Sequence, residues 1–345
     1  MQKHSRFIDF LLAGEDVSMP KQSRVPVTKL IELLQESNTP DERRTIVEYI
    51  QNHSDEFVNV LETSFSKDTL LKGRLLNLVD LLNSTLMIRV IEKAVMDDDT
   101  HIRIKGLQAA YRTRVDTVNA HVEKILASSE EEFEARKWAL HILGSTDPKY
   151  YSRQIMKIAR DASEDIRLRK EAVFALTKIV NDKTLGTLCT LLGEPSTEMR
   201  QAGAWALSNI GAPESIICLL AALDDEDDNV RDWAIRGLRD MDDARALQGL
   251  ADAIHSSSPK EQVRMVRLVI ERRSEVILRA IVELLDSQDV DVKRTAAWAL
   301  SVSPYPPAVP SLKILLDDHD EQTRNYAKVA LIRSGGLDPT DLKLD

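Results

Sequence analysis

Hydrophobic residues recur along this chain at the three- and four-residue spacing of amphipathic helices. In the clearest stretch, an acidic turn from Asp225 leads into Val230 and Arg231, with Ala234 three residues after the arginine and Leu238 seven after it. Residues at this spacing lie on one face of a helix. The small alanine lets a neighbouring helix approach closely, so the stretch predicts a helix with a tightly packed seam.

The same pattern returns along the chain, with a basic residue at a fixed place in each copy. These register marks are residues 43, 72, 103, 136, 169, 200, 231, 264, 293 and 324. Their spacing averages about 31 residues, which accommodates two helices and two tight turns but not the 34-residue tetratricopeptide unit. Between the marks lie leucine-rich stretches such as Leu188, Leu191 and Leu192, typical of a buried helix stripe. The chain is therefore predicted to be an all-α protein, an α-solenoid of about ten helix pairs.

One copy departs from the pattern. Counted from Arg264, the usual alanine and leucine positions hold Arg267 and Glu271. Charged groups do not fill a packed seam, so this copy has either a shifted register or an altered structure.

Turn chemistry marks the ends of the second helix in each pair. Asp99, Ser196 and Asp289 stand where a helix should begin, and Gly144 and Gly211 where one should stop. The acidic clusters around residues 97–99, 130–132, 224–228 and 317–321 are interpreted as caps of this kind, since no calcium-binding loop pattern accompanies them. The arginines at the register marks are expected to form a ladder with turn aspartates of neighbouring repeats.

Three regions are predicted. Residues 1–24 hold a short amphipathic segment and a linker, residues 25–335 the solenoid, and residues 336–345 a tail. The first segment is interpreted as a cap over the exposed end of the solenoid, or alternatively as a docking peptide for another chain.

The motif Asp/Asn-x-Val-Arg-x-x-Ala-x-x-x-Leu, as in Asp228 to Leu238, resembles the HEAT-like repeats of phycobilisome lyase subunits and of many prokaryotic stand-alone proteins. The resemblance is clearest from about residue 98 to 335 and fainter before it. It implies an alpha-alpha superhelix whose second helices line a concave face, the usual place for a binding partner. Such a motif is strong evidence for a fold and weak evidence for a function.

The exposed face of the second helices can be followed at the position five residues after each register mark. This row reads Gln108, His141, Phe174, Trp205, Arg236, Val269 and Trp298. Exposed aromatic groups at Phe174, Trp205 and Trp298 would indicate a binding surface, whereas the same groups folded into the seam would be core. Trp138 and Trp233 stand nearer the packed side and are interpreted as core.

Basic residues share this predicted face. They include Arg236, Arg239, Arg272 and Arg294, and with the aromatic row they could hold an acidic peptide, a phosphorylated segment or single-stranded nucleic acid. The alternative is ordinary pairing with the many acidic residues on the surface. The predicted partner-binding set is Phe174, Trp205, Trp298, His141, Arg236, Arg239, Arg272 and Arg294.

Composition narrows the classes of function. The formal net charge of -10 disfavours nucleic acid and anionic lipid as overall partners, although a local basic patch can still bind either. Cys189 and Cys218 lie in apolar stretches and are interpreted as buried free thiols, which suits a reducing cytoplasm. No apolar run reaches the roughly 20 residues of a membrane span, and no secretory signal is recognised. A cytoplasmic protein is expected.

Patterns that carry catalysis are missing. None of the seven histidines is followed by glutamate, and there is no His-Glu-x-x-His, Cys-x-x-Cys or phosphate-binding glycine loop. No metal, cofactor or catalytic residue is therefore assigned, and an enzyme has no support. The predicted function is a scaffold or adaptor that binds a protein or acidic peptide in the concave groove. The alternatives are a phycobilin lyase-like chromophore-handling subunit and a nucleic-acid-binding protein using the basic C-terminal half.

Overall fold

The computed structural model describes residues 27–29, 31, 40–65 and 69–338, and every regular element in these ranges is helical. The predicted all-α class is thus confirmed. The chain forms two compact units, Met1–Ile155 with Ser163–Glu171 and Met156–Ala162 with Ala172–Asp345. The segment 1–24 and most of the tail 336–345 lie outside the described residues.

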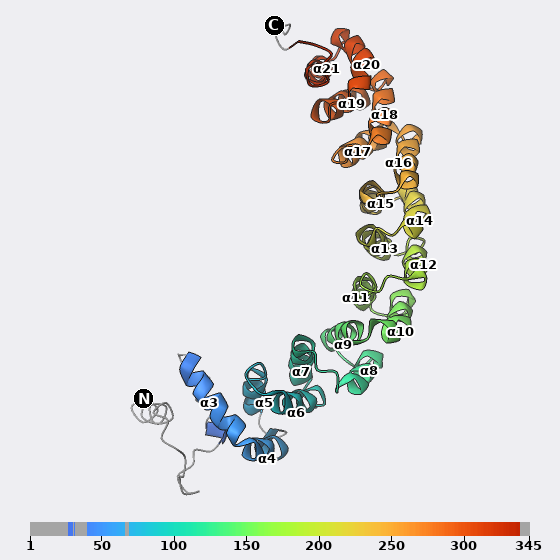
Figure 1. The fold of residues 1–345 in the computed structure, drawn as a ribbon. Helices are drawn as coiled ribbons and strands as arrows, with labels where there is room; N and C mark the ends of the chain where they lie inside the picture. Colours follow the sequence, from blue (N-terminus) through green and yellow to red (C-terminus); the bar gives the residue numbers. More distant parts are fainter. Residues whose placement is uncertain (1–26, 30, 32–39, 66–68, 339–345) are drawn as a thin grey trace. The chain divides into compact units, whose positions relative to one another are not determined.

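Unit 1 is built from paired helices of 8 to 14 residues, coloured blue to green in Figure 1. Its helices are α3 (Pro40–Asn52), α4 (Ser54–Ser64), α5 (Thr69–Leu76), α6 (Ser84–Val95), α7 (Thr100–Thr113), α8 (Asn119–Ala127) and α9 (Phe133–Thr146). Helices α10 (Pro148–Arg160) and α11 (Ile166–Leu176) each contribute residues to both units.

Unit 2 continues the alternation in two layers (Figure 1). The first-helix layer contains α12 (Asp182–Leu191), α14 (Ile216–Ala221), α16 (Ala244–Ser256), α18 (Glu275–Glu283) and α20 (Val309–Ile314). The second-helix layer contains α13 (Thr197–Ile210), α15 (Asp228–Asp240), α17 (Pro259–Val269), α19 (Val290–Val302) and α21 (Glu321–Arg333). Each second helix packs against the second helix of the next pair, which is the stacking expected of a solenoid.

The seam predicted from the sequence forms the core of these contacts. Val230, Ala234 and Leu238 of α15 are fully buried. Close approach is visible at Gly237, where an added Cβ would lie 2.9 Å from the Cα of Ser208 in α13. Small residues at this seam therefore set how tightly successive second helices pack.

Capping follows the predicted chemistry at most helix ends. The side chains of Asp99, Ser196 and Asp289 each accept a backbone N–H in the first turn of their helix. Gly211 ends α13 in the left-handed conformation, with φ at 62°. Gly144 was expected to end a helix, and this was wrong, because α9 continues through it to Thr146.

The expected arginine ladder is present and joins consecutive repeats. Six of the register cations pair with an acid in the following helix pair, at distances of 2.6 to 3.1 Å. These pairs, called the register ladder below, are Lys72–Asp97, Arg103–Glu131, Arg136–Glu164, Arg200–Asp225, Arg231–Glu261 and Lys293–Asp318. Arg200 also donates to the carbonyls of Glu194 and Pro195 at the start of its own helix, so one guanidinium ties two turns together.

The irregular copy has a shifted register. Gln262, rather than Arg264, occupies the register position, since its amide donates to the carbonyl of Ile254 much as Arg136 donates to that of Leu126. Counted from Gln262, the alanine and leucine positions hold Met265 and Val269, and both are buried. Substituting 262 for 264 makes the spacing 31 residues at every step from 200 to 324.

The two cysteines form a disulfide, so the expectation of free thiols was wrong. Cys189 on α12 and Cys218 on α14 are bonded, and their Cα atoms lie 5.6 Å apart. Stacking of successive first helices brings together two residues 29 positions apart in the chain. Local apolar context could not show this pairing, and the inference of a reducing compartment loses its basis.

Candidate functional site

The corrected register changes the row of residues on the exposed face of the second helices. In unit 2 the row is Phe174, Trp205, Arg236, Arg267 and Trp298, carried by α11, α13, α15, α17 and α19, and it is called the outward row below. Val269, which the sequence reading placed in this row, is fully buried, and Arg267 takes its place. The sequence alone could have shown this, because Arg267 lies 31 residues after Arg236 and 31 residues before Trp298.

The aromatic members of the outward row are partly exposed. Phe174 is 40% exposed, and its ring stacks on that of Trp205 with centroids 5.9 Å apart and planes 14° apart. The ammonium of Lys178 lies 5.1 Å from the Phe174 ring. Trp205 and Trp298 are half-buried. All three rings therefore keep part of their surface open to solvent, as an aromatic anchor for a partner requires.

The outward row also carries two arginines. Arg236 and Arg267 are exposed, and within the described residues neither makes a hydrogen bond or ion pair. The guanidinium carbon of Arg236 lies 5.7 Å from the centroid of the Trp233 ring, which is a cation–π contact. These guanidinium groups keep their donors available for a ligand.

The other predicted arginines have acid partners inside the chain. Arg239 contacts Glu271 at 2.6 Å, Arg272 contacts Asp242 at 3.0 Å, and Arg294 contacts Asp320 at 2.9 Å. The hydrogen bond from Arg294 holds the pKa of Asp320 well below its usual value. Surface pairing, the alternative considered from the sequence, describes these three arginines.

Ion pairs border the outward row on both sides. Toward the N-terminal ends of the second helices, Arg264 bonds Asp232 at 2.7 Å, and Arg294 bonds Asp320. Toward the C-terminal ends, Arg239 bonds Asp240 and Glu271. The partly exposed rings and the unpaired arginines of the outward row thus lie between two sets of ion-paired side chains.

His141 belongs to unit 1 and has a different environment. Its ring lies 6.1 Å from Tyr111 and 6.0 Å from Trp138, and its Nε2 lies 3.1 Å from a carboxylate oxygen of Glu171. Trp138, interpreted as core, is half-buried, and its indole N–H is buried without a hydrogen-bond partner in the described structure. The structure therefore does not bring His141 together with the unit 2 aromatics as one described site.

The sequence matches the family model described as HEAT repeats at residues 152–239 and 247–332, which together cover half of the chain. The chain belongs to the HEAT-repeat family. No curated protein matches the sequence. The narrower resemblance to phycobilisome lyase subunits stays a prediction.

Several solved structures align with this HEAT-repeat chain at low sequence identity. An engineered protein is 18% identical and aligns over 90% of this chain and 99% of its own, with a TM-score of 0.40. Kap121p is 13% identical and aligns over 96% of this chain and 43% of its own, with a TM-score of 0.52. Human deoxyhypusine hydroxylase is 18% identical and aligns over 84% of this chain and 98% of its own, with a TM-score of 0.32. Together with the HEAT-repeat match, the likeness to Kap121p shows an α-solenoid, that is, a scaffold of helical repeats, and nothing further.

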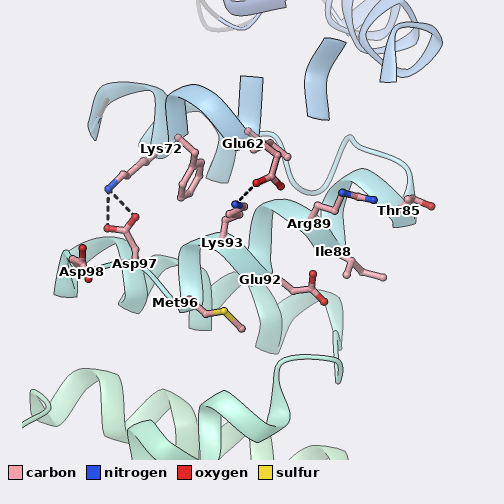
Figure 2. A pocket seen from close by; sticks show the side chains of 12 residues that line it. Glu62, Lys72, Thr85, Ile88, Arg89, Glu92, Lys93, Met96, Asp97 and Asp98 are labelled. Atoms are coloured by element: carbon pink, nitrogen blue, oxygen red, sulfur yellow. Dashed lines mark hydrogen bonds and ion pairs between the residues drawn. The ribbon is translucent and has the colours of Figure 1, made fainter. Parts of the chain in front are cut away.

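A pocket of about 800 Å³ opens in unit 1 of the HEAT-repeat chain, between α4, α5 and α6 (Figure 2). Phe65 lies in its buried floor. Lys72 and Asp97 pair at one end at 2.7 Å, and Lys93 pairs with Glu62 at 2.6 Å. These two ion pairs neutralise four of the charged groups that line the pocket.

Among the described helices, none combines the length and hydrophobicity that a membrane span requires. No group of histidine, cysteine or carboxylate side chains within the described residues has the arrangement of a metal site.

Proposed function

We propose that this HEAT-repeat chain is a protein-binding scaffold that holds an acidic segment of its partner along the outward row of unit 2. The observation that carries the proposal is the combination in that row: two exposed, unpaired arginines, Arg236 and Arg267, flanked by partly open rings at Trp205 and Trp298. His141, Arg239, Arg272 and Arg294 already have acid partners and are not included in the proposed contact.

The chemistry of the outward row supports this choice of ligand. Tryptophan and arginine dominate the binding energy of protein interfaces when they are surrounded by groups that exclude water. A guanidinium presents a planar fork of donors that matches a carboxylate or a phosphate. In a chain of net charge -10, two cations left without a partner at adjacent helices provide a local site for an anion.

Solved structures show that this fold can hold a protein. Kap121p bound to Ste12p aligns over 96% of this chain with a TM-score of 0.52, at 12% identity. That structure supports only the statement that a solenoid of this kind can bind a protein. The class of partner proposed for this chain is argued from its own surface residues.

The test is capture of partners by the tagged full-length chain from lysate of its native host, with quantitative mass spectrometry. Three variants are compared with the natural chain: Trp205→Ala with Trp298→Ala, Arg236→Glu with Arg267→Glu, and the control Arg153→Glu. Arg153 is exposed on α10 and tests the effect of one such charge reversal at a residue that is not a member of the outward row. One stoichiometric protein should be retained by the control and lost by both double variants, with far-ultraviolet circular dichroism unchanged.

Other outcomes would overturn the proposal. Equal retention by all variants would remove the outward row from binding. If the tryptophan variant loses its helical signal, those rings are core, and the arginine variant alone decides the question. A coloured eluate would favour the chromophore-handling alternative. Nucleic acid whose retention falls steeply with salt would favour the nucleic-acid alternative.

A further inference from the structure

The outward row has a fixed step, and this step limits the shape of its ligand. Neighbouring members are separated by 31 residues and stand at the same register position on successive second helices. Packed helices lie about 8–10 Å apart. Equivalent side chains on consecutive helices of unit 2 therefore repeat at roughly this distance, and Trp205 and Trp298 lie three steps apart.

A polyproline II segment matches this step. It rises about 3.1 Å per residue and completes a turn in three residues. Every third side chain consequently points to the same side and advances about 9 Å. A segment in this conformation, laid across the second helices, presents one side chain to each repeat.

A β-strand and an α-helix fit less well. Side chains on one side of a strand advance about 7 Å at every second residue or about 13 Å at every fourth, and both distances miss the step. Residues seven apart on a helix advance about 10.5 Å, but a helix with its side chains is about 10–12 Å wide. It would rest on the ion pairs Arg264–Asp232 and Arg239–Glu271 that border the row, whereas a thin extended chain lies between them.

We infer that the partner segment binds in a polyproline II conformation and carries an apolar residue, two acidic residues and a second apolar residue at three-residue intervals. The inference rests on the proposed function and specifies its partner. The acidic groups pair with Arg236 and Arg267, one for each guanidinium. The apolar residues lie on the rings of Trp205 and Trp298, so the recognised segment is about ten residues long.

The test uses fluorescein-labelled synthetic peptides and the full-length chain, with binding followed by fluorescence anisotropy. The first peptide has leucine at positions one and ten and glutamate at positions four and seven, with serine and proline elsewhere. The second has the same composition with the two glutamates adjacent. The third is a helix-forming peptide with its glutamates seven residues apart. Exposed ion pairs contribute modestly, so the first peptide should bind about 3- to 10-fold more tightly than the other two.

Variants assign this preference to the row. Arg236→Gln with Arg267→Gln should remove the advantage of the first peptide, whereas Arg153→Gln should keep it. Equal binding of the first two peptides, or stronger binding of the helical one, would overturn the inference while leaving the proposed acidic-segment site in place. If none of the three peptides binds the natural chain at millimolar concentration, both the inference and the proposed function fall.

Discussion

The register ladder predicts a large loss of stability when one of its buried arginines is removed. Arg200 is 7% exposed and donates to the carboxylates of Asp225 and Glu226, with Nε 2.8 Å from Asp225 Oδ2. The Asp225 side chain is itself only 10% exposed. Arg200→Met keeps much of the side-chain volume but leaves this carboxylate without its cation. Breaking a buried pair in this way costs about 3–5 kcal/mol, and we expect a loss in this range.

Arg245 provides the matched control. It also pairs with an aspartate, Asp243 at 2.7 Å, but its side chain is 70% exposed and the pair lies within one turn. Exposed pairs contribute about 0–1 kcal/mol, so Arg245→Met should change little. Urea unfolding followed by circular dichroism measures both variants, and hydrogen exchange of α13 and α15 locates the effect. If Arg200→Met costs no more than Arg245→Met, the ladder does not hold the repeats together.

Two further predictions test the joints between repeats. The hydrogen bond from Lys293 lowers the pKa of Asp318 below its usual 3.8 in the folded protein. The ionised pair therefore contributes its full stabilisation of the folded state above pH 3.8, and this contribution is lost as the pH falls through the lowered pKa. Lys293→Met should therefore lower the free energy of unfolding by about 1–3 kcal/mol at neutral pH and by much less in acid. Urea unfolding at a series of pH values measures this difference, and an equal loss at every pH would contradict the prediction. Replacing Cys189 and Cys218 by serine should cost about 2–4 kcal/mol, because their bond closes a 29-residue separation. Thiol labelling of the unreduced natural chain should find neither cysteine free, and complete labelling would refute the bond.

The fold could be predicted from the sequence because each repeat carries its own packing and capping residues. Val230, Ala234 and Leu238 recur as a buried triplet, and capping residues such as Asp289 mark the helix starts. These are local signals, repeated many times, and one faulty copy does not hide them. The ladder was also predictable in outline, since a basic residue recurs at one register position and an acidic turn recurs from repeat to repeat.

The candidate site depended on register and on long-range pairing, which local patterns do not determine. Choosing Arg264 as the mark displaced the row by two residues, placing buried Val269 where exposed Arg267 belongs. The pairing of Arg239 with Glu271 joins residues 32 positions apart, and the disulfide joins residues 29 apart. Such contacts follow from how successive repeats stack, and in one sequence many cations and acids compete for each partner.

The ladder also gives the array a direction. In every pair of the register ladder the cation belongs to one repeat and the acid to the repeat that follows it, as in Arg103–Glu131 and Arg136–Glu164. Deleting one whole internal repeat would therefore place the cation of its predecessor beside the acid of its successor, so a pair of the same kind can form across the new junction. The ladder consequently accommodates the loss or gain of whole repeats, whereas replacing a single partner leaves the opposite charge buried and unpaired.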